Sequence, residues 1–480
     1  MLNLQPIFHV IGLLSAYLGA LMLVPAVFDA IAENPDWKVF VISAGILLFF
    51  GCSVAIANRK SGQMKLSKRQ AFVMTTAGWL MVAAFSALPF LGLGIDYSDA
   101  FFEAMSGITT TGSTVLMGLD QMPPGILLWR ALLQWVGGVG IVVTAIFILP
   151  FLRVGGMQLF QTESSERSDQ IVVVATELTR SIVTIYVALT AAAAVAYGIA
   201  GMAPFDAICH ALTTVSTGGY ANYDASFSNY GAAIHWVAVV FMIAGAFPFV
   251  AYIRMIRGQP LSLWRDPQAR TLIVFLLVVG ALMGAWLSVS RDIQLFDALR
   301  LSYFNVVSVV TTTGFVSDDF SAWGPLAVVS FFILMFVGGC TGSTAGSVKI
   351  YRYQVLRILV DAHLKVLVRP SRIVGISYHG RHLPDDVPAS ILAFVSAFFG
   401  IIMVFTFLLS AMSIDFVTAL SATVTAITNV GPGLGPIVGP SGNFAALPDA
   451  AKWMLSIAML LGRLELFTVL VLIHPNFWKA

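Results

Sequence analysis

Thr311-Thr312-Thr313-Gly314-Phe315 is the stretch that decides how this chain is organised, because the sequence carries it four times in altered form. Each copy is a short run of small residues, mostly with hydroxyl groups, that leads into a glycine. The other copies are Thr109-Thr110-Thr111-Gly112-Ser113, Val215-Ser216-Thr217-Gly218-Gly219 and Thr428-Asn429-Val430-Gly431-Pro432. Their glycines are separated by 106, 96 and 117 residues, which indicates a fourfold internal repeat.

Glycine suits such a segment because it lacks a Cβ and tolerates the φ values that turn successive carbonyls toward one point. Four segments around an axis would form a ring of carbonyl oxygens that can replace the hydration shell of a cation. A single copy would be only a turn, whereas four copies predict a cation pore. The predicted filter residues are Thr110, Thr111, Gly112, Ser216, Thr217, Gly218, Thr312, Thr313, Gly314, Asn429, Val430 and Gly431.

The composition places the chain in a membrane. Of its 480 residues, 58% are hydrophobic and only 10% are charged, and the mean hydropathy is +0.88. Soluble domains carry about a quarter charged residues. Many apolar runs near the length of a membrane span therefore predict a multi-spanning helical protein, with the first run retained as a span. The three cysteines are scattered and suggest neither a disulfide framework nor a metal cluster.

The apolar runs predict ten spans and four shorter helices that end at the filters. Two spans, residues 4–26 and 39–57, precede the repeats. Each repeat then reads as a span, a half-helix, a filter and a second span. The predicted fold is an all-α membrane protein with four pseudo-fourfold repeats around one pore, plus two extra N-terminal transmembrane helices. Its parts are residues 1–70 for the helix pair and a basic loop, then pore repeats over 71–165, 166–266, 267–383 and 384–480.

Basic residues set the predicted orientation. Of the 26 lysines and arginines, 20 fall in the loops 58–70, 153–180, 254–270 and 349–381 or at Lys479. Such residues mark the cytoplasmic side, so both termini are predicted to be cytoplasmic and the filters to face outward. Acidic residues on the outer side would concentrate cations or simply solvate the loops; examples are Asp120, Asp224, Asp318 and Asp319.

Each predicted half-helix ends at its filter, so the negative end of its dipole would point at the ion. An aspartate stands near the start of each one. We expect these four residues to cap the exposed N–H groups, with only an indirect effect on the ion. They are Asp99, Asp206, Asp297 and Asp415.

The second span of the third repeat contains a glycine-rich interruption, Gly338-Gly339-Cys340-Thr341-Gly342-Ser343-Thr344-Ala345-Gly346. Several glycines together should break a helix. Broken backbone at membrane depth is tolerated only where it lines a cavity or is buried in protein. The segment is either a loop across the pore that acts as a gate, or a close helix crossing through small residues. The predicted gating residues are Gly338, Gly339, Gly342, Gly346 and Arg463.

Arg463 is assigned to the gate because it falls within the last span, where a charge needs a partner. Glu465 is two positions away, and residues at that spacing do not face each other on a helix. A guanidinium has five donors and suits a cluster of carbonyls, such as those freed in the glycine-rich loop. We expect Arg463 to latch the loop shut; the alternative is a structural ion pair with a neighbouring span.

The order of span, half-helix, filter and span, repeated after an extra helix pair, resembles the Trk/Ktr/HKT superfamily of potassium transporters, and most of all its TrkH subunits. The most specific stretches are Ser216-Thr217-Gly218-Gly219-Tyr220, Thr428 to Gly433, the glycine-rich loop and Leu461 to Thr468. The resemblance implies potassium as the transported ion, one pore per subunit, a homodimer, and a cytoplasmic nucleotide-binding regulatory ring of the TrkA type. In that superfamily a serine in place of the first filter glycine accompanies sodium permeation, so Gly112 favours potassium.

The resemblance implies uptake across a bacterial inner membrane and no enzymatic activity. A proton- or sodium-coupled symporter is an alternative, for which the half-helices offer only Glu103 and His210 as ionisable groups. A membrane enzyme or receptor with an unrelated repeat is a second alternative. His379 and His382, with Asp385 and Asp386, have a spacing typical of metal ligands, but they are expected to form a solvated loop and not a metal site. Glu163, Glu166, Arg167 and Asp169 are either a candidate docking surface for a soluble partner or simply a hydrated loop.

Overall fold

The computed structural model describes residues 3–59, 67–152, 168–371, 374–384 and 386–479. Within these residues the fold is helical except for one hairpin, β1 (Ser377–Tyr378) and β2 (Arg381–His382). Seven helices contain continuous stretches that are long and apolar enough to cross a membrane. They are α1 (Gln5–Ile31), α2 (Trp37–Ala57), α3 (Lys68–Ser86, extended by the 3₁₀ turn η1, Leu88–Leu93), α5 (Pro124–Leu152), α6 (Ser168–Ile199), α11 (Pro267–Arg291) and α15 (Asp386–Ala411).

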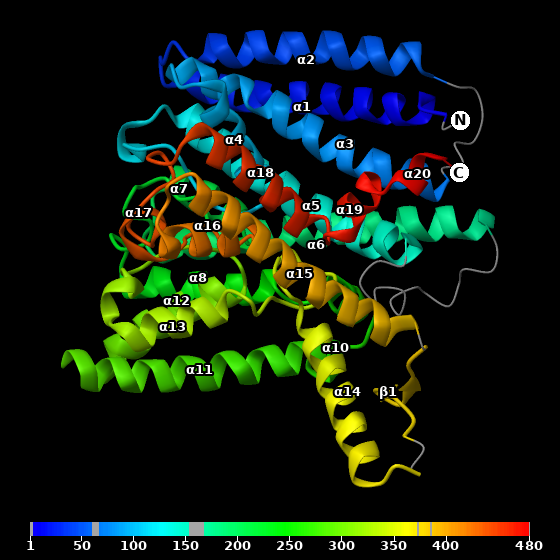
Figure 1. Ribbon diagram of the computed structural model, residues 1–480. Helices are drawn as coiled ribbons and strands as arrows, with labels where there is room; N and C mark the ends of the chain where they lie inside the picture. The colour runs from blue at the N-terminus through cyan, green and yellow to red at the C-terminus, as the bar shows by residue number, and fades with distance from the viewer. Residues whose placement is uncertain (1–2, 60–66, 153–167, 372–373, 385, 480) are drawn as a thin grey trace.

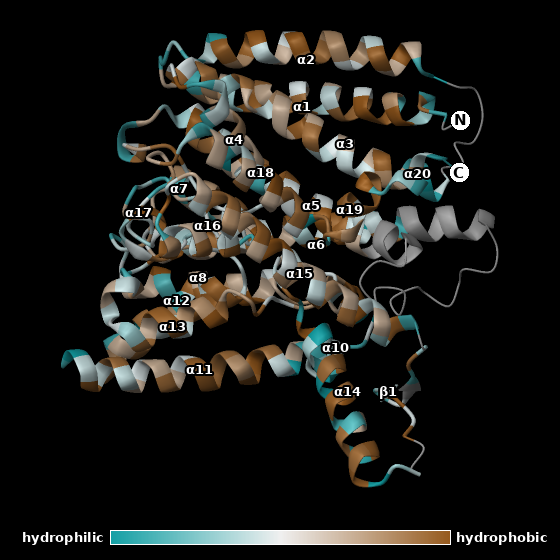
Figure 2. Ribbon diagram, viewed as in Figure 1, coloured by the Kyte–Doolittle hydropathy of each residue, from teal (hydrophilic) through white to brown (hydrophobic). Residues whose placement is uncertain are grey.

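These helices carry apolar residues over most of their length (Figure 2). Large apolar side chains stand exposed on them, for example Phe49 at 78% and Phe407 at 73%. Exposed apolar surface of this extent is what a lipid environment covers. The chain is a multi-pass helical membrane protein, as the composition predicted.

Four shorter helices lie where half-helices were predicted: α4 (Tyr97–Ile108), α7 (Pro204–Val215), α12 (Leu295–Val310) and α16 (Phe416–Thr428). Three of the second spans pack on the half-helix of the next repeat in the ring: α5 on α7, α8 on α12, and α18 on α4. The half-helices α4, α7 and α16 gather toward one end of the bundle, and both chain termini lie at the other end (Figure 1).

The predicted capping role of the four aspartates is wrong for three of them. Only Asp415 is an N-cap, accepting from the Thr418 N–H at 3.0 Å. Hydrogen bonding from Thr418, chiefly from its side chain and then from its N–H, lowers the pKa of the Asp415 carboxyl, which lies outside the spans. The others stand inside the first turn, where an acidic group still complements the helix dipole but cannot cap. Asp99 pairs with Lys452 of α18 at 2.5 Å, and Asp297 pairs with Arg300 at 3.1 Å.

Two second spans predicted to be continuous are broken. α8 (Ala232–Gly245) and α9 (Phe249–Ile256) meet at 90°, and α18 (Asp449–Arg463) and α19 (Phe467–Ile473) meet at 117°. Pro248 explains the first break, since proline has no N–H and also restricts the residue before it. At the second break Glu465 and Leu466 have positive φ values, 61° and 46°, which cannot continue a helix.

The predicted break in the third repeat is present. α13 (Pro325–Leu334) ends before the glycine-rich stretch and α14 (Ile350–Val368) begins after it. Val337 and Val348 form an isolated bridge that brings the two ends of the loop together. α14 then leaves the bundle as a projecting helix (Figure 1).

The N-terminal pair α1 and α2 packs through small residues. A Cβ on Gly12 would lie 2.6 Å from the Ala55 nitrogen, so only glycine permits this approach. α1 also runs beyond residue 26, where the first span was predicted to end: Asp29 is inside the helix and accepts a hydrogen bond from the Gly125 N–H at 2.6 Å. The remaining short elements are α10 (Ser262–Arg265), α17 (Gly435–Val438), α20 (Pro475–Lys479), η2 (Leu119–Gln121) and η4 (Phe320–Trp323).

Candidate functional site: four filter segments and the loop beside them

The four filter segments share one backbone turn. Each starts with a residue in the left-handed region, and the residue two positions later is a glycine with positive φ. In each, the N–H of the middle residue donates to the carbonyl five positions earlier, at 2.9, 2.9, 2.8 and 3.1 Å. The starting residues are Thr110, Thr217, Thr312 and Asn429, with φ of 51°, 52°, 56° and 56°; the glycines are Gly112, Gly219, Gly314 and Gly431, with φ of 88°, 79°, 85° and 109°.

This equivalence corrects the predicted register of the second repeat. The counterpart of Gly112 is Gly219, not Gly218, and the segment is Thr217-Gly218-Gly219 where Ser216-Thr217-Gly218 was predicted. Two adjacent glycines left the choice open in the sequence, and the hydrogen bond from the Gly218 N–H to the Thr213 carbonyl settles it. The registers predicted for the other three segments agree with the structure.

The segments contact one another in a closed cycle. Gly112 faces the carbonyl of Gly218, Gly219 faces that of Thr313, and Gly314 faces that of Val430. The cycle closes because a Cβ on Gly431 would lie 2.7 Å from the Thr111 carbonyl oxygen. Each glycine therefore needs both a positive φ and the room that a missing Cβ leaves.

A cavity of about 560 Å³ opens over this cycle. All four glycines of the positive-φ positions line it, together with Asp224, Tyr223 and Arg130. Asp224 is not free to act as a simple surface charge, because it accepts from the N–H groups of Gly118 at 2.8 Å and Leu119 at 3.1 Å. The cavity therefore forms an opening directly above the four filter segments.

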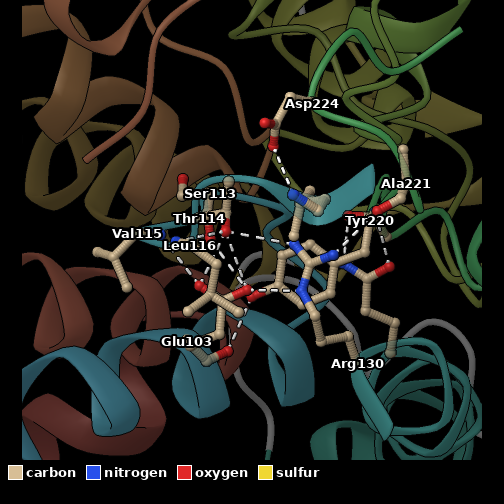
Figure 3. A network of polar contacts seen from close by, with 12 residues as sticks. Glu103, Ser113, Thr114, Val115, Leu116, Arg130, Tyr220, Ala221 and Asp224 are labelled. Atoms are coloured by element: carbon tan, nitrogen blue, oxygen red, sulfur yellow. Dashed lines mark hydrogen bonds and ion pairs between the residues drawn. The ribbon is translucent and has the colours of Figure 1, made fainter. Parts of the chain in front are cut away.

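A buried ion pair that the sequence reasoning missed joins the first two segments (Figure 3). Arg130 Nε donates to Glu103 at 2.8 Å, and both side chains are at most 1% exposed. Arg130 also donates to the Ala221 carbonyl at 2.9 Å and lies over the Tyr220 ring, 4.0 Å from its centroid. Glu103 accepts in addition from the Thr114 hydroxyl and the Val115 N–H, each at 3.0 Å. One Arg and one Glu in apolar stretches of the same repeat were the signal that could have revealed the pair.

Asp206 supports the second segment in a similar way. Its carboxylate accepts from Asn222 Nδ2 at 2.7 Å and from the Tyr223 hydroxyl at 2.8 Å. The hydrogen bond to this carboxylate raises the pKa of Tyr223, which stands in the outer loop. The first turn of α7 is thereby fixed to the chain that leaves its own filter.

The glycine-rich loop lies against the inner ends of the half-helices. The Gly346 N–H donates to Thr312 Oγ1 at 2.7 Å, and a Cβ on Gly346 would lie 2.7 Å from the Thr428 carbonyl oxygen. The break between α8 and α9 receives the other side of the loop, where the Cys340 N–H donates to the Ala246 carbonyl at 3.0 Å. The loop is therefore buried in protein, and some of its backbone polar groups are hydrogen-bonded to residues at the break between α8 and α9.

Arg463 is the last residue of α18 and reaches the loop as expected. Its Nη1 donates to the Thr344 carbonyl at 2.8 Å and its Nη2 to the Gly137 carbonyl at 3.4 Å. Glu465 turns away to pair with Arg352 at the start of α14. Among the described residues no ion pair involves Arg463, so it bonds carbonyls where the alternative required an acid.

The remaining predicted site residues lie apart from the filters. His379 and His382 belong to the exposed hairpin, and no group of three metal-ligating side chains is found in the part of the chain that the structure describes. Glu163, Glu166, Arg167 and Asp385 fall outside the described residues, as does the side chain of Asp169.

Known proteins resemble this chain along its whole length. A family model described as TrkH, cation transport protein, matches residues 38–480. The Trk system potassium uptake protein TrkI of Halomonas elongata is 44% identical over 99% of this chain and 97% of its own. The Trk system potassium uptake protein TrkH of Escherichia coli K12 is 34% identical, with complete coverage of both chains. The crystal structure of the potassium transporter TrkH from Vibrio parahaemolyticus matches with a TM-score of 0.91 and 34% identity, covering 99% of this chain and 100% of that one.

Proposed function

The chain belongs to the TrkH family of cation transport proteins, and from that membership we propose that it takes up potassium ions across the bacterial inner membrane. The observation that carries the proposal is the closed cycle of four filter segments below an open cavity. Relatives that share the full length of the chain are named as potassium uptake proteins, which supports potassium as the ion. The family is one of transporters, so the chain is not assigned an enzymatic activity.

The proposed architecture is a pore with pseudo-fourfold symmetry formed by one chain. Its quarters are the repeats 71–165, 166–266, 267–383 and 384–480, and residues 1–70 add the outer pair α1 and α2 with a basic loop. The packing of α5 on α7, α8 on α12 and α18 on α4 supports this division. The filter residues are those of the four segments, with Thr217, Gly218 and Gly219 in the second.

In the proposed mechanism, potassium sheds water in the mouth and enters between the four backbone segments. The half-helices end at these segments, so their negative dipole ends stabilise the ion. The ion moves down the membrane potential, which at about 2.3 kcal/mol per charge per 100 mV sustains roughly a fiftyfold gradient. No ion coupling is needed for inward accumulation of that size.

The gate in this proposal is the loop with Gly338, Gly339, Gly342 and Gly346, held by Arg463. Its position against α12 and α16 supports an obstruction directly inside the filters. Opening requires the loop to leave these contacts. Arg463 then acts as the latch, because its hydrogen bond to Thr344 must break first.

The resemblance to TrkH proteins extends the proposal to partners and orientation. We propose a homodimer with one pore per subunit, surrounded by membrane lipid and regulated by a cytoplasmic nucleotide-binding ring. The termini and the basic loops would face the cytoplasm and the filters the outside. The positions of both termini at the end of the bundle away from α4, α7 and α16 support this orientation (Figure 1).

Coupled symport receives less support from the geometry. A coupling residue must change its protonation or partner during transport, and Glu103 is held by Arg130, Thr114 and the Val115 N–H. The test of the function is growth rescue at low potassium in a bacterial strain without its own uptake systems. Rescue by the wild type and loss of rescue with Gly314→Ser are expected; Gly231→Ser, at a glycine with no atom within 4 Å of its missing Cβ, is the matched control. A wild-type protein that reaches the membrane without supporting growth contradicts the proposal.

A further inference from the structure

The second and third filter segments each begin with a threonine in a conformation that threonine avoids. Thr217 and Thr312 have φ of 52° and 56°, although a β-branched side chain makes the left-handed region unfavourable. Such strain persists only where surrounding contacts enforce it. Both side chains are almost completely buried, so the enforcing contacts come from neighbouring protein.

The glycine-rich loop supplies a contact to each of these threonines. The Gly346 N–H donates to Thr312 Oγ1 at 2.7 Å. Thr344 Oγ1 lies 3.2 Å from Thr217 Oγ1 and 2.9 Å from the Gly245 carbonyl oxygen. Thr344 is fully buried and is also the residue whose carbonyl accepts from Arg463. One residue of the loop therefore touches a filter segment, the α8–α9 break and the latch.

The first and fourth segments do not depend on the loop in this way. Thr110 has the same positive φ, 51°, but among the described residues its Oγ1 has no hydrogen-bond partner, so packing and the backbone hydrogen bond from the Thr111 N–H to the Ser106 carbonyl hold its turn without the loop. Asn429 tolerates the left-handed region better than threonine does, and its Nδ2 donates to Thr111 Oγ1 at 2.9 Å and to the Met459 carbonyl at 3.0 Å. Hydrogen bonds thus join the loop to the starting residues of two segments of the four, donated by Thr217 in one case and by the Gly346 N–H in the other.

We propose that potassium in the filter holds the loop shut, through the pairs Thr217–Thr344 and Thr312–Gly346. The seated loop stabilises the ordered form of the second and third segments, and coupling between two sites is reciprocal. An ion that needs the ordered filter must therefore favour the seated loop, while an ion that does not need it leaves the loop free. Abundant external potassium would then slow its own uptake. This inference rests on the proposed function, because it takes potassium as the ion that the ordered filter binds.

Cys340 is a built-in reporter for the position of the loop. It is buried at 0% exposure while the loop is seated, and its N–H is bonded to Ala246. Replacing Cys52 and Cys209 with alanine leaves it as the single thiol of the chain, since the sequence has three cysteines. The rate at which a small permeant maleimide labels Cys340 then measures how often the loop leaves its seat, without any transport assay.

The experiment compares labelling of purified single-thiol protein in potassium and in sodium at equal ionic strength. Potassium should slow labelling by about fivefold or more, the usual lower range for coupled sites. Thr344→Val should abolish the difference and Thr344→Ser should keep it. The matched control is Thr341→Val in the same loop, whose hydroxyl has no partner among the described residues and which should keep the potassium effect.

Thr312→Val removes the acceptor of the Gly346 N–H and provides a second test if Thr344→Val does not fold. Equal labelling rates in potassium and sodium for the wild type would overturn the inference. A potassium effect that survives in both Thr344→Val and Thr312→Val would overturn the assigned contacts. Potassium flux into liposomes, measured separately, decides the proposed function: its absence would remove the premise, whereas flux without a labelling difference removes only the coupling.

Discussion

Gly219→Ser is the substitution that best separates the proposed second filter segment, which ends at Gly219, from the predicted one, which ends at Gly218. Gly219 has φ of 79°, and a Cβ there would collide with the Thr313 carbonyl of the next segment. Serine must either keep this φ against strain or move the backbone of two segments. Both routes alter the positions of the carbonyls that are proposed to select the ion.

The size of the effect follows from the strain. Residues held in such a region cost about 1–3 kcal/mol each. If the segments relieve that cost by giving up the potassium geometry, the potassium-to-sodium permeability ratio should fall by about fivefold to one hundredfold, since 1.4 kcal/mol is a factor of ten. The additional collision with a carbonyl oxygen places the expectation in the upper part of this range.

The assay is uptake of potassium and of sodium into liposomes under an imposed inside-negative potential, with purified protein of equal content. Gly231→Ser is the control, because Gly231 has an extended backbone and open space at the missing Cβ. A wild-type permeability ratio in well-folded Gly219→Ser protein would refute the reasoning from φ and from the closed cycle.

Two further substitutions and one deletion test the surroundings of the filter. Arg463→Gln should raise potassium flux with the fold preserved, because it weakens the latch on Thr344; reduced flux from a stable protein counts against the latch. Deleting Gly338 to Gly346 should also raise flux, since the bridge between Val337 and Val348 lets the ends rejoin, and loss of flux in a folded deletion would point to a packing role. Glu103→Gln should lower stability by about 3–5 kcal/mol in a thermal or denaturant unfolding measurement, because it leaves Arg130 buried without its counter-charge. Adding Arg130→Met to that variant should recover part of the loss, and full additivity of the two changes would argue against a direct pair.

Local signals in the sequence were enough to predict the half-helices, the glycine-containing turns that follow them and the broken third repeat. Each of them is marked by residues with an intrinsic backbone effect, such as Gly314 or the glycines from Gly338 to Gly346. The break after Arg463 has no such mark: Glu465 and Leu466 adopt positive φ in a stretch that reads as continuous helix, with Glu465 bonded to distant Arg352. Pro248 was a usable signal for the other break.

The sequence also could not predict which residues the charged side chains pair with. Asp99 was expected to cap its own helix, yet it binds Lys452, more than 350 positions away. The register of Gly218 and Gly219 was ambiguous for a similar reason, since only the neighbouring segment determines which glycine needs the positive φ. Tertiary packing decides such cases, and no local pattern encodes it.

All four filter segments belong to one polypeptide, and this frees the quarters from being copies of one another. In a ring of four identical subunits, a loop that reaches the inner ends of the half-helices would arrive from every side at once, and four loops would compete for one space. Here a single quarter supplies it, through the stretch from Gly338 to Gly346, and another quarter supplies Arg463 to meet it. A single loop beneath the filters therefore requires repeats that differ from one another. A gene that encoded one repeat, assembled as four identical copies, could not provide them.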